Sequence, residues 1–210
     1  TGKTIVVGGH YDSVQYGPGA NDDGSGTGTA LEVARILAKY KFSTDLTFIA
    51  FGSEEIGLVG SYNYVNSLSE EQLSSILGMI NLDMVGVGDT FSAGDIKPGD
   101  GWLVQRALET GAALGYSMES FEAASNSDHT YFEDAGVPVV FLRWRPDPNY
   151  HTAGDTVDKL SPEALNRTAD VVGVMLHDLA KNPLPDAPQG LRAKLTKYHS
   201  VYRDEPVDLE

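Results

Sequence analysis

Apolar residues along the chain form two kinds of pattern, short continuous runs and stripes of helical spacing. The continuous runs predict buried strands at residues 4–8, 45–51, 79–85 and 137–142. Apolar positions spaced three and four apart predict helices from about Ala30 onward and over 58–68, 101–114 and 162–179, with Ser25 or Thr27 as the cap of the first. Because strands and helices alternate, we expect an α/β fold with a mostly parallel mixed β-sheet flanked by helices on both faces.

The length of 210 residues and the lack of an internal linker predict one main domain over 1–182. Residues 183–210 contain several prolines and are expected to form a separate tail. The chain enters its first strand almost at once, so we expect an N-terminal part to have been trimmed. No apolar run reaches the roughly 18 residues that a membrane span needs, so no membrane partner is expected.

Charge and composition narrow the possible chemistry. The formal net charge is −15, which disfavours binding to a phosphate backbone, so we expect no nucleic-acid partner. The chain has no cysteine, which excludes disulfides, thiolate metal sites and a cysteine nucleophile. Any transition metal must therefore be held by histidine and carboxylate side chains.

Polar side chains follow each predicted strand at its carboxyl end. The loop that enters the first helix adds Asp22 and Asp23. Ligands of open α/β sheets bind beyond the carboxyl ends of the strands, so we expect these groups to meet at one edge. They are His10 and Asp12 after the first strand, Glu54 and Glu55 after the second, Asp83 at the end of the third, and Tyr150 and His151 after the fourth.

Most of these groups also have an ordinary interpretation when taken alone. The run of Asp and Ser around Asp22 is typical of a helix N-terminus, and Glu54 with Glu55 is typical of solvated charge. Asp83 differs, because its apolar neighbours would bury it and an unpaired buried carboxylate costs several kcal/mol. Together, two histidines and several carboxylates form a ligand set that suits a pair of zinc ions.

Six short motifs occur in the order found in a known family. The chain resembles the M28 metallopeptidases, in particular the secreted di-zinc aminopeptidases of bacteria and fungi, from about residue 4 to 179. The motifs are His-Tyr-Asp-Ser at 10–13, Pro-Gly-Ala-Asn-Asp-Asp-Gly-Ser-Gly at 18–26, Ser-Glu-Glu-Ile-Gly-Leu-Val-Gly-Ser at 53–61, Asn-Leu-Asp-Met at 81–84, Ser-Asp-His at 127–129 and Tyr-His-Thr at 150–152.

The resemblance implies the zinc-dependent exopeptidase (phosphorylase/hydrolase-like) form of the fold, with two Zn²⁺ ions per chain. Asp22 would bridge the ions, and the peptide that joins it to Asp23 would be cis. The other ligands would be His10 and Asp83 for one ion, and Glu55 and His151 for the other.

The resemblance also implies catalytic roles. Glu54 would be the general base for a hydroxide bound between the two zinc ions, and Tyr150 would donate a hydrogen bond to the developing oxyanion. Asp12 would accept a hydrogen bond from the ring of His10 and orient it. Asp128 and His129 would lie near the substrate.

The function implied is hydrolysis of the N-terminal bond of peptide substrates by a secreted metallo-aminopeptidase. A carboxypeptidase of the same family stays open, because Arg143 and Arg145 offer candidates for the basic pocket that acidic C-termini need. A glutaminyl cyclase with a single zinc is also open, although the presence of both His10 and Asp83 argues against it. A non-catalytic binding module is a further alternative. Side-chain preference and oligomeric state are left undetermined.

Overall fold

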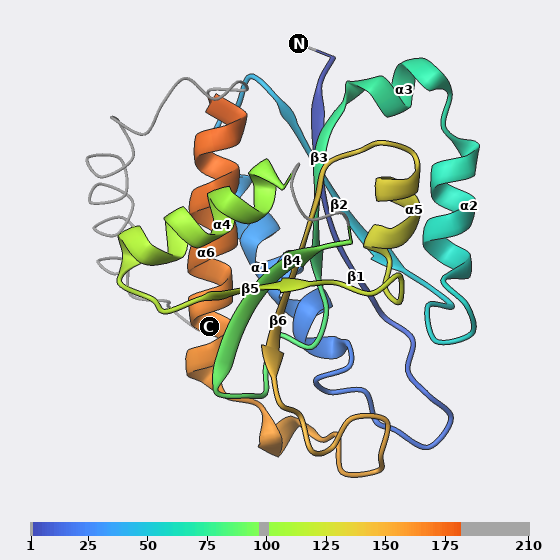
Figure 1. The fold of residues 1–210 in the computed structure, drawn as a ribbon, viewed down its shortest axis with the longest axis vertical. Coiled ribbons are helices and arrows are strands. Elements are labelled where there is room, and N and C mark those ends of the chain that lie inside the picture. The colour runs from blue at the N-terminus through green and yellow to red at the C-terminus, as the bar shows by residue number, and fades with distance from the viewer. Residues whose placement is uncertain (1, 97–100, 182–210) are drawn as a thin grey trace.

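The computed structural model describes residues 2–96 and 101–181, and these contain a six-stranded mixed sheet of order β2-β1-β3-β6-β4-β5 (Figure 1). Four strands run parallel to one another, namely β1 (Thr4–His10), β2 (Asp45–Phe51), β3 (Ile76–Leu82) and β6 (Val139–Arg145). The remaining two, β4 (Thr90–Asp95) and β5 (Glu119–Glu122), are parallel to each other and antiparallel to β6.

Helices cover both faces of the sheet (Figure 1). One face carries α1 (Gly24–Leu37), α4 (Trp102–Leu114) and α6 (Pro162–Lys181), and the other carries α2 (Val59–Ser67), α3 (Glu70–Ser75) and α5 (His129–Asp134). Alternate strand residues enter two apolar cores, as when Ile5 and Val7 pack on the first side and Val6 on the second. A 3-10 helix, η1 (Val157–Lys159), precedes α6. The α/β prediction is therefore confirmed.

The predicted elements are present with shifted ends, and five of the described elements lacked a prediction, namely β4, β5, α3, α5 and η1. Strands β4 and β5 are the two at one side of the sheet, and neither has a continuous apolar run because glycine, serine and acidic residues interrupt them. Helices α3 and α5 have six residues each, too short for a periodic stripe. The predicted tail at 183–210 lies outside the described residues. None of the described helices is long and apolar enough to span a bilayer.

The start of α1 corrects one prediction. The cap is Asp23, whose carboxylate accepts a hydrogen bond of 2.9 Å from the backbone N–H of Gly26. Ser25 and Thr27, which the sequence favoured, instead donate their hydroxyls to backbone carbonyls at 2.7 Å and 2.6 Å. A Cβ at Gly26 would lie 2.3 Å from the carbonyl oxygen of Leu82, so only glycine lets the helix start this close to the sheet.

Candidate active site

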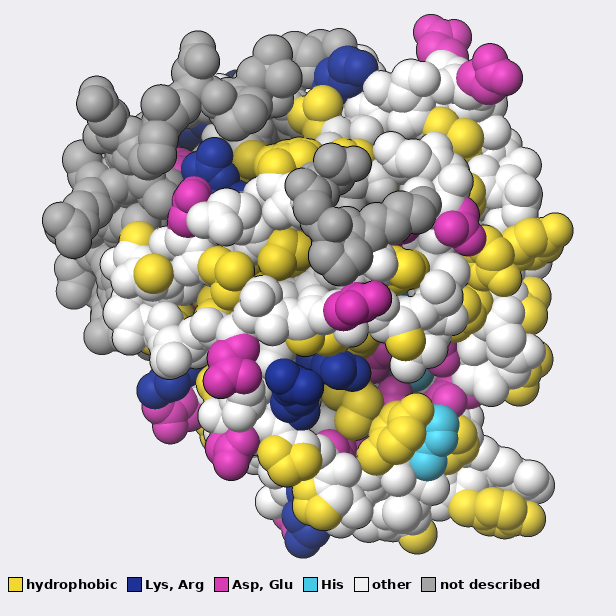
Figure 2. All heavy atoms as spheres, viewed as in Figure 1, with side chains coloured by type: hydrophobic (Ala, Val, Ile, Leu, Met, Phe, Trp, Pro, Cys, Tyr) yellow, Lys and Arg dark blue, Asp and Glu magenta, His cyan; other side chains and the backbone are white. Residues whose placement is uncertain are grey.

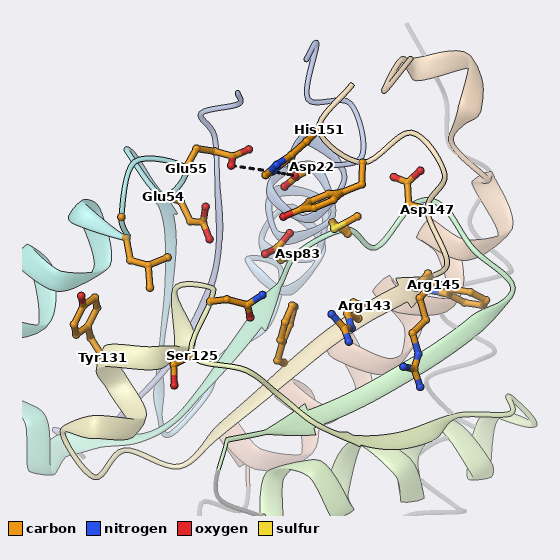
Figure 3. Close-up of a pocket in the computed structure, with 17 residues that line it drawn as sticks. Asp22, Glu54, Glu55, Asp83, Ser125, Tyr131, Arg143, Arg145, Asp147 and His151 are labelled. Atoms are coloured by element: carbon orange, nitrogen blue, oxygen red, sulfur yellow. Dashed lines mark ion pairs between the residues drawn. The ribbon is translucent and has the colours of Figure 1, made fainter. Parts of the chain in front are cut away.

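The polar residues predicted to meet do lie together at the carboxyl edge of the parallel strands. Figure 3 shows Asp22, Glu54, Glu55, Asp83 and His151 turned toward one region of a cavity of about 690 Å³. His10 ends β1 beneath them and is 1% exposed. The parallel register brings residues more than a hundred positions apart within contact distance.

The centre of the cluster is the carboxylate of Asp22, which lies between two imidazoles. Its Oδ1 is 3.0 Å from Nε2 of His10, and its Oδ2 is 3.1 Å from Nε2 of His151. Asp83 Oδ1 lies 3.8 Å from the same His10 nitrogen, and Glu55 Oε2 lies 3.0 Å from the His151 nitrogen. Two groups of three therefore share Asp22, one on each side of its carboxylate.

These separations fit ligands around metal ions. Two ligand atoms about 2.0–2.1 Å from a tetrahedral zinc ion are about 3.3 Å apart, close to the distances found here. Among the described residues, five buried carboxylate oxygens have no hydrogen-bond donor, and three of them belong to this cluster: Asp22 Oδ2, Asp83 Oδ1 and Glu55 Oε1. The other two are the oxygens of Asp128. Buried lone pairs without a donor are costly unless a cation meets them, so this donor set fits a pair of zinc ions.

The pKa of His10 also indicates that this cluster favours a bound cation. Burial lowers the pKa of its imidazole, but the contacts with Asp22 and Asp83 outweigh burial and raise the pKa far above its ordinary value. The surrounding carboxylates thus hold a positive charge strongly at this position. A cluster with that property binds a cation wherever the ligand geometry allows.

Asp23 also lies within 4.8 Å of His10 and Asp83, but its oxygens are already used. Its Oδ2 accepts from the backbone N–H of His10 at 3.1 Å, and its Oδ1 accepts from those of Gly26 and Met84. One carboxylate therefore ties the end of β1, the start of α1 and the loop after β3 together. Asp23 is a positioning residue, and the peptide that joins it to Asp22 is cis.

Asp155 is a positioning residue that the sequence did not reveal. It is 2% exposed, and its two carboxylate oxygens accept the backbone N–H groups of Asn21 at 2.7 Å and Asp22 at 3.0 Å. Its neighbours form no periodic pattern, so the only available signal was an aspartate four residues after His151 in a turn-rich segment. Asp155 fixes the loop that presents Asp22.

Asp12 acts differently from the sequence-based expectation. Its backbone carbonyl, 3.0 Å from Nδ1 of His10, is the hydrogen-bond partner of the ring, while its carboxylate lies 3.6 Å away. The carboxylate instead accepts the backbone N–H groups of Glu54 at 3.0 Å and Glu55 at 3.2 Å. Asp12 thus orients the His10 ring with its main chain and the two glutamates with its side chain.

Glu54 lies beside the ligand cluster without being one of its five members. Its side chain is buried, and burial raises the pKa of the carboxyl to about 8. His10 opposes this rise, and Asp83, Asp128 and Glu55 add to it. A carboxyl whose pKa is near neutrality exchanges a proton readily at physiological pH. Glu54 lines the cavity with this shifted pKa, and its role as general base stays a prediction.

Tyr150 stacks on His151 at the cavity rim, with ring centroids 3.8 Å apart. Partial burial and the nearby carboxylates of Asp22 and Asp83 raise the pKa of the phenol to about 12. The hydroxyl therefore keeps its proton at neutral pH and can donate a hydrogen bond into the cavity.

Backbone strain is concentrated around the same cavity. Among the described non-glycine residues, positive φ occurs at Ser53, Leu58, Met84 and His151. Three of the four belong to the cluster of candidate ligands or lie within two residues of a member, and Leu58 lines the cavity. Each such conformation costs about 1–2 kcal/mol, and such strain is common where a chain must aim functional side chains.

The sequence was compared with models of known protein families. The model of peptidase family M28 matches residues 1–176. The chain belongs to peptidase family M28. Among curated M28 relatives, aminopeptidase YwaD of Bacillus subtilis is 35% identical over 84% of this chain and 41% of its own length. Leupeptin-inactivating enzyme 1 of Streptomyces exfoliatus is 31% identical over 87% of this chain and 47% of its own.

Solved M28 structures agree with the fold. An aminopeptidase from Aneurinibacillus sp. strain AM-1 has a TM-score of 0.81 and 38% identity, covering 86% of this chain and 44% of its own. A zinc aminopeptidase from Bacillus subtilis has a TM-score of 0.82 and 33% identity, covering 89% of this chain and 48% of its own. The chain thus spans less than half the length of these M28 proteins.

Two residues expected near the substrate lie deeper in the M28 fold. Asp128 and His129 are both fully buried at the start of α5, and neither lines the cavity. Burial raises the pKa of the Asp128 carboxyl to about 7 and lowers that of the His129 imidazole to about 4. Their neighbour Ser127 has the direct contact, because its hydroxyl donates 2.7 Å to Oδ2 of Asp83.

Proposed function

We propose that the protein is a di-zinc aminopeptidase that hydrolyses the N-terminal bond of peptides. The observation that carries the proposal is the carboxylate of Asp22 between His10 and His151, with Glu54 next to the cluster. The M28 relatives named aminopeptidases support the same activity. Because this chain covers less than half of their length, activity and substrate are proposals.

The five ligands divide into two sets around one bridging carboxylate. His10 and Asp83 complete the first with Asp22, and Glu55 and His151 complete the second. When bound, a zinc pair lowers the pKa of water toward neutrality and polarises a carbonyl oxygen. Asp12, Asp23 and Asp155 hold the ligand loops in place through backbone hydrogen bonds, which limits the cost of assembling the site.

Glu54 moves the proton in this proposal. Its carboxylate takes the proton of the attacking water and delivers it to the amine that leaves with the shortened peptide. Burial raises the pKa of the Glu54 carboxyl, which makes its carboxylate a stronger base than an exposed glutamate.

Tyr150 stabilises the developing oxyanion by donating its phenolic hydrogen. The stacking on His151 holds the ring at the rim of the cavity, close to the ligand cluster. The acidic wall of the same cavity favours a substrate with a protonated α-amine, which suits a free N-terminus.

The test combines metal analysis with hydrolysis of leucine p-nitroanilide by the zinc-loaded protein. We expect two zinc ions per chain and release of p-nitroaniline, and we expect Glu54→Gln to reduce kcat by about 1,000-fold or more. The same variant should keep both zinc ions, because Glu54 is not a ligand in this proposal. Glu71→Gln, an exposed glutamate on α3, is the matched control and should behave as wild type.

Two results would contradict the proposal. If the zinc-loaded protein releases no p-nitroaniline, the proposed activity is wrong. If the N-acetylated substrate is hydrolysed equally well, the proposed requirement for a free amine is wrong. A stoichiometry of one zinc with cyclisation of N-terminal glutamine would favour the glutaminyl cyclase alternative.

We also propose that the protein acts outside the cell, as the resemblance to secreted aminopeptidases implies. Fractionation of the source cells, with detection of this chain by antibody, tests the location. The chain in the culture medium is the expected result, and its confinement to the cell lysate would overturn it.

A further inference from the structure

The cavity that holds the ligand cluster has walls of opposite charge. Asp22, Glu54, Glu55 and Asp83 line one side, and Arg143 and Arg145 line another (Figure 3). Asp147 lies on the arginine side too, where its carboxylate accepts hydrogen bonds from Asn21 and the backbone of Asn149. The space-filling view shows a hollow with basic side chains along one edge and acidic and histidine side chains along the other (Figure 2). The chain has a net charge of −15, so two arginines beside the cavity form a local positive region on an acidic protein.

The strand β6 places these arginines by its alternation. Val140, Leu142 and Trp144 point into the core beneath α4 and α6, so Phe141, Arg143 and Arg145 face the opposite side. The guanidinium of Arg143 lies over the ring of Phe121 at 4.2 Å and near that of Phe141 at 5.5 Å. Stacking of this kind restrains the side chain and leaves its N–H edge free to bind.

The two arginines differ in their partners. Arg145 has a carboxylate oxygen of Glu119 at 3.7 Å. Within residues 2–96 and 101–181, no carboxylate lies within 4.0 Å of Arg143, and its buried Nε has no hydrogen-bond acceptor. Burial lowers the pKa of this guanidinium, the direction expected for a partly desolvated cation whose charge is incompletely compensated.

We propose that Arg143 binds a carboxylate of the peptide substrate and makes the enzyme select for it. A guanidinium matches a carboxylate in bidentate geometry, and Arg143 lines the cavity with no carboxylate partner among the described residues. The inference rests on the proposed peptidase function, because it assigns the bound anion to the substrate. Arg145, already paired with Glu119, adds positive potential to the same wall.

Two sources supply this chemistry. One is the side chain of an N-terminal aspartate or glutamate, and the other is the C-terminal carboxylate of a dipeptide or tripeptide. Both lie within a few bonds of the N-terminal peptide bond, and Arg143 lines the same cavity of about 690 Å³ as Asp22, Glu55, Asp83 and His151.

The experiment measures kcat/KM for two matched substrate pairs with the zinc-loaded enzyme. Glutamate and glutamine p-nitroanilides differ in a side-chain carboxylate, and Leu-Gly and Leu-Gly-amide differ in a C-terminal carboxylate. We expect a preference of about tenfold or more for the carboxylate member of one pair, which identifies the source. Arg143→Gln should abolish that preference mainly through KM, leave the neutral member within about twofold, and leave zinc content unchanged.

Further variants separate recognition from general damage. Arg143→Lys keeps the positive charge but loses the bidentate guanidinium geometry. We therefore expect this variant to keep part of the preference that Arg143→Gln loses. Arg167→Gln, which removes a guanidinium paired with Glu163 on α6 away from the cavity, is the matched control and should keep the full preference. Thermal unfolding of each variant reports whether it is folded.

A binding measurement makes the result independent of turnover. Calorimetric titration of zinc-loaded Glu54→Gln protein with the same dipeptide pair, and with glutamate and glutamine amides, should show the same carboxylate preference and its loss when Arg143→Gln is added. Equal affinities within both pairs, or a preference that survives Arg143→Gln, would overturn the proposal. Absence of hydrolysis for all substrates with carboxylate-selective binding intact would count against the peptidase function alone.

Discussion

Oδ2 of Asp155 accepts a hydrogen bond of 3.0 Å from the backbone N–H of Asp22, although 133 positions separate the two residues. The other oxygen of the same carboxylate accepts from Asn21 at 2.7 Å. The residue proposed to bridge two metal ions is thus held through its main chain by a buried acid beyond the last ligand.

Asp155→Asn tests this support. The substitution replaces one acceptor with an amide donor facing a backbone N–H, so the loop that presents Asp22 should shift. We expect zinc affinity to fall by about 10- to 100-fold, the usual effect of losing a group that orients a ligand. Competition with a chromophoric chelator measures it. Asp158→Asn, at an exposed aspartate of η1, is the control, and equal affinities in both variants would deny Asp155 this role.

Metal removal should destabilise the fold. The buried oxygens of Asp22, Asp83 and Glu55 that lack donors repel one another unless a cation lies between them. With free zinc at about 100 times Kd, binding adds roughly 3 kcal/mol to the free energy of unfolding. Calorimetry with and without chelator should show a lower Tm for the stripped protein, restored by zinc. A Tm that chelation leaves unchanged would contradict a site at this cluster.

Tyr150→Phe should affect the transition state more than binding. The substitution keeps the stacking on His151 and removes only the hydroxyl, whose pKa near 12 marks it as a donor at neutral pH. Loss of one donor to an oxyanion lowers kcat by about 100-fold, and we expect KM to change by less than about threefold. Steady-state kinetics with leucine p-nitroanilide checks this. A change confined to KM would assign Tyr150 to substrate binding instead.

His129→Leu should flatten the dependence of stability on pH. Burial lowers the pKa of His129 to about 4 from its ordinary value of 6.5, so the unfolded chain binds a proton that the folded chain does not in this interval. Stability from this residue is therefore full above about pH 6.5 and falls as pH decreases toward about 4, by an order of ~3 kcal/mol. Urea unfolding of metal-free wild type and variant at about pH 7 and about pH 4.5 measures the difference. Parallel losses in the two proteins would refute the assignment.

The strands and helices that the sequence predicted are those with a strong periodic or continuous apolar pattern. β1, β3 and β6 have buried runs, and α1, α4 and α6 have apolar stripes, so local sequence already encodes their burial. β2 was predicted as a buried strand from its apolar run, but only Phe51 of it is buried. β4 contains Gly94 and β5 has only four residues, so neither has a local pattern that predicts a strand. Both are strands because they pair with neighbouring strands of the sheet. Long-range pairing decided those two elements.

The candidate site shows the same division. The sequence by itself determined the ligand types and their convergence, because each predicted strand is followed by His, Asp or Glu at its carboxyl end and parallel strands bring those ends together. Only the tertiary structure decided that Asp155 holds Asp22 and that Asp12 accepts hydrogen bonds from the backbone of both glutamates. It also decided that Arg143 lines the cavity with no carboxylate partner among residues 2–96 and 101–181. The physical reason is that such contacts depend on the distance and direction of single atoms, which the spacing of residue types along a chain does not specify.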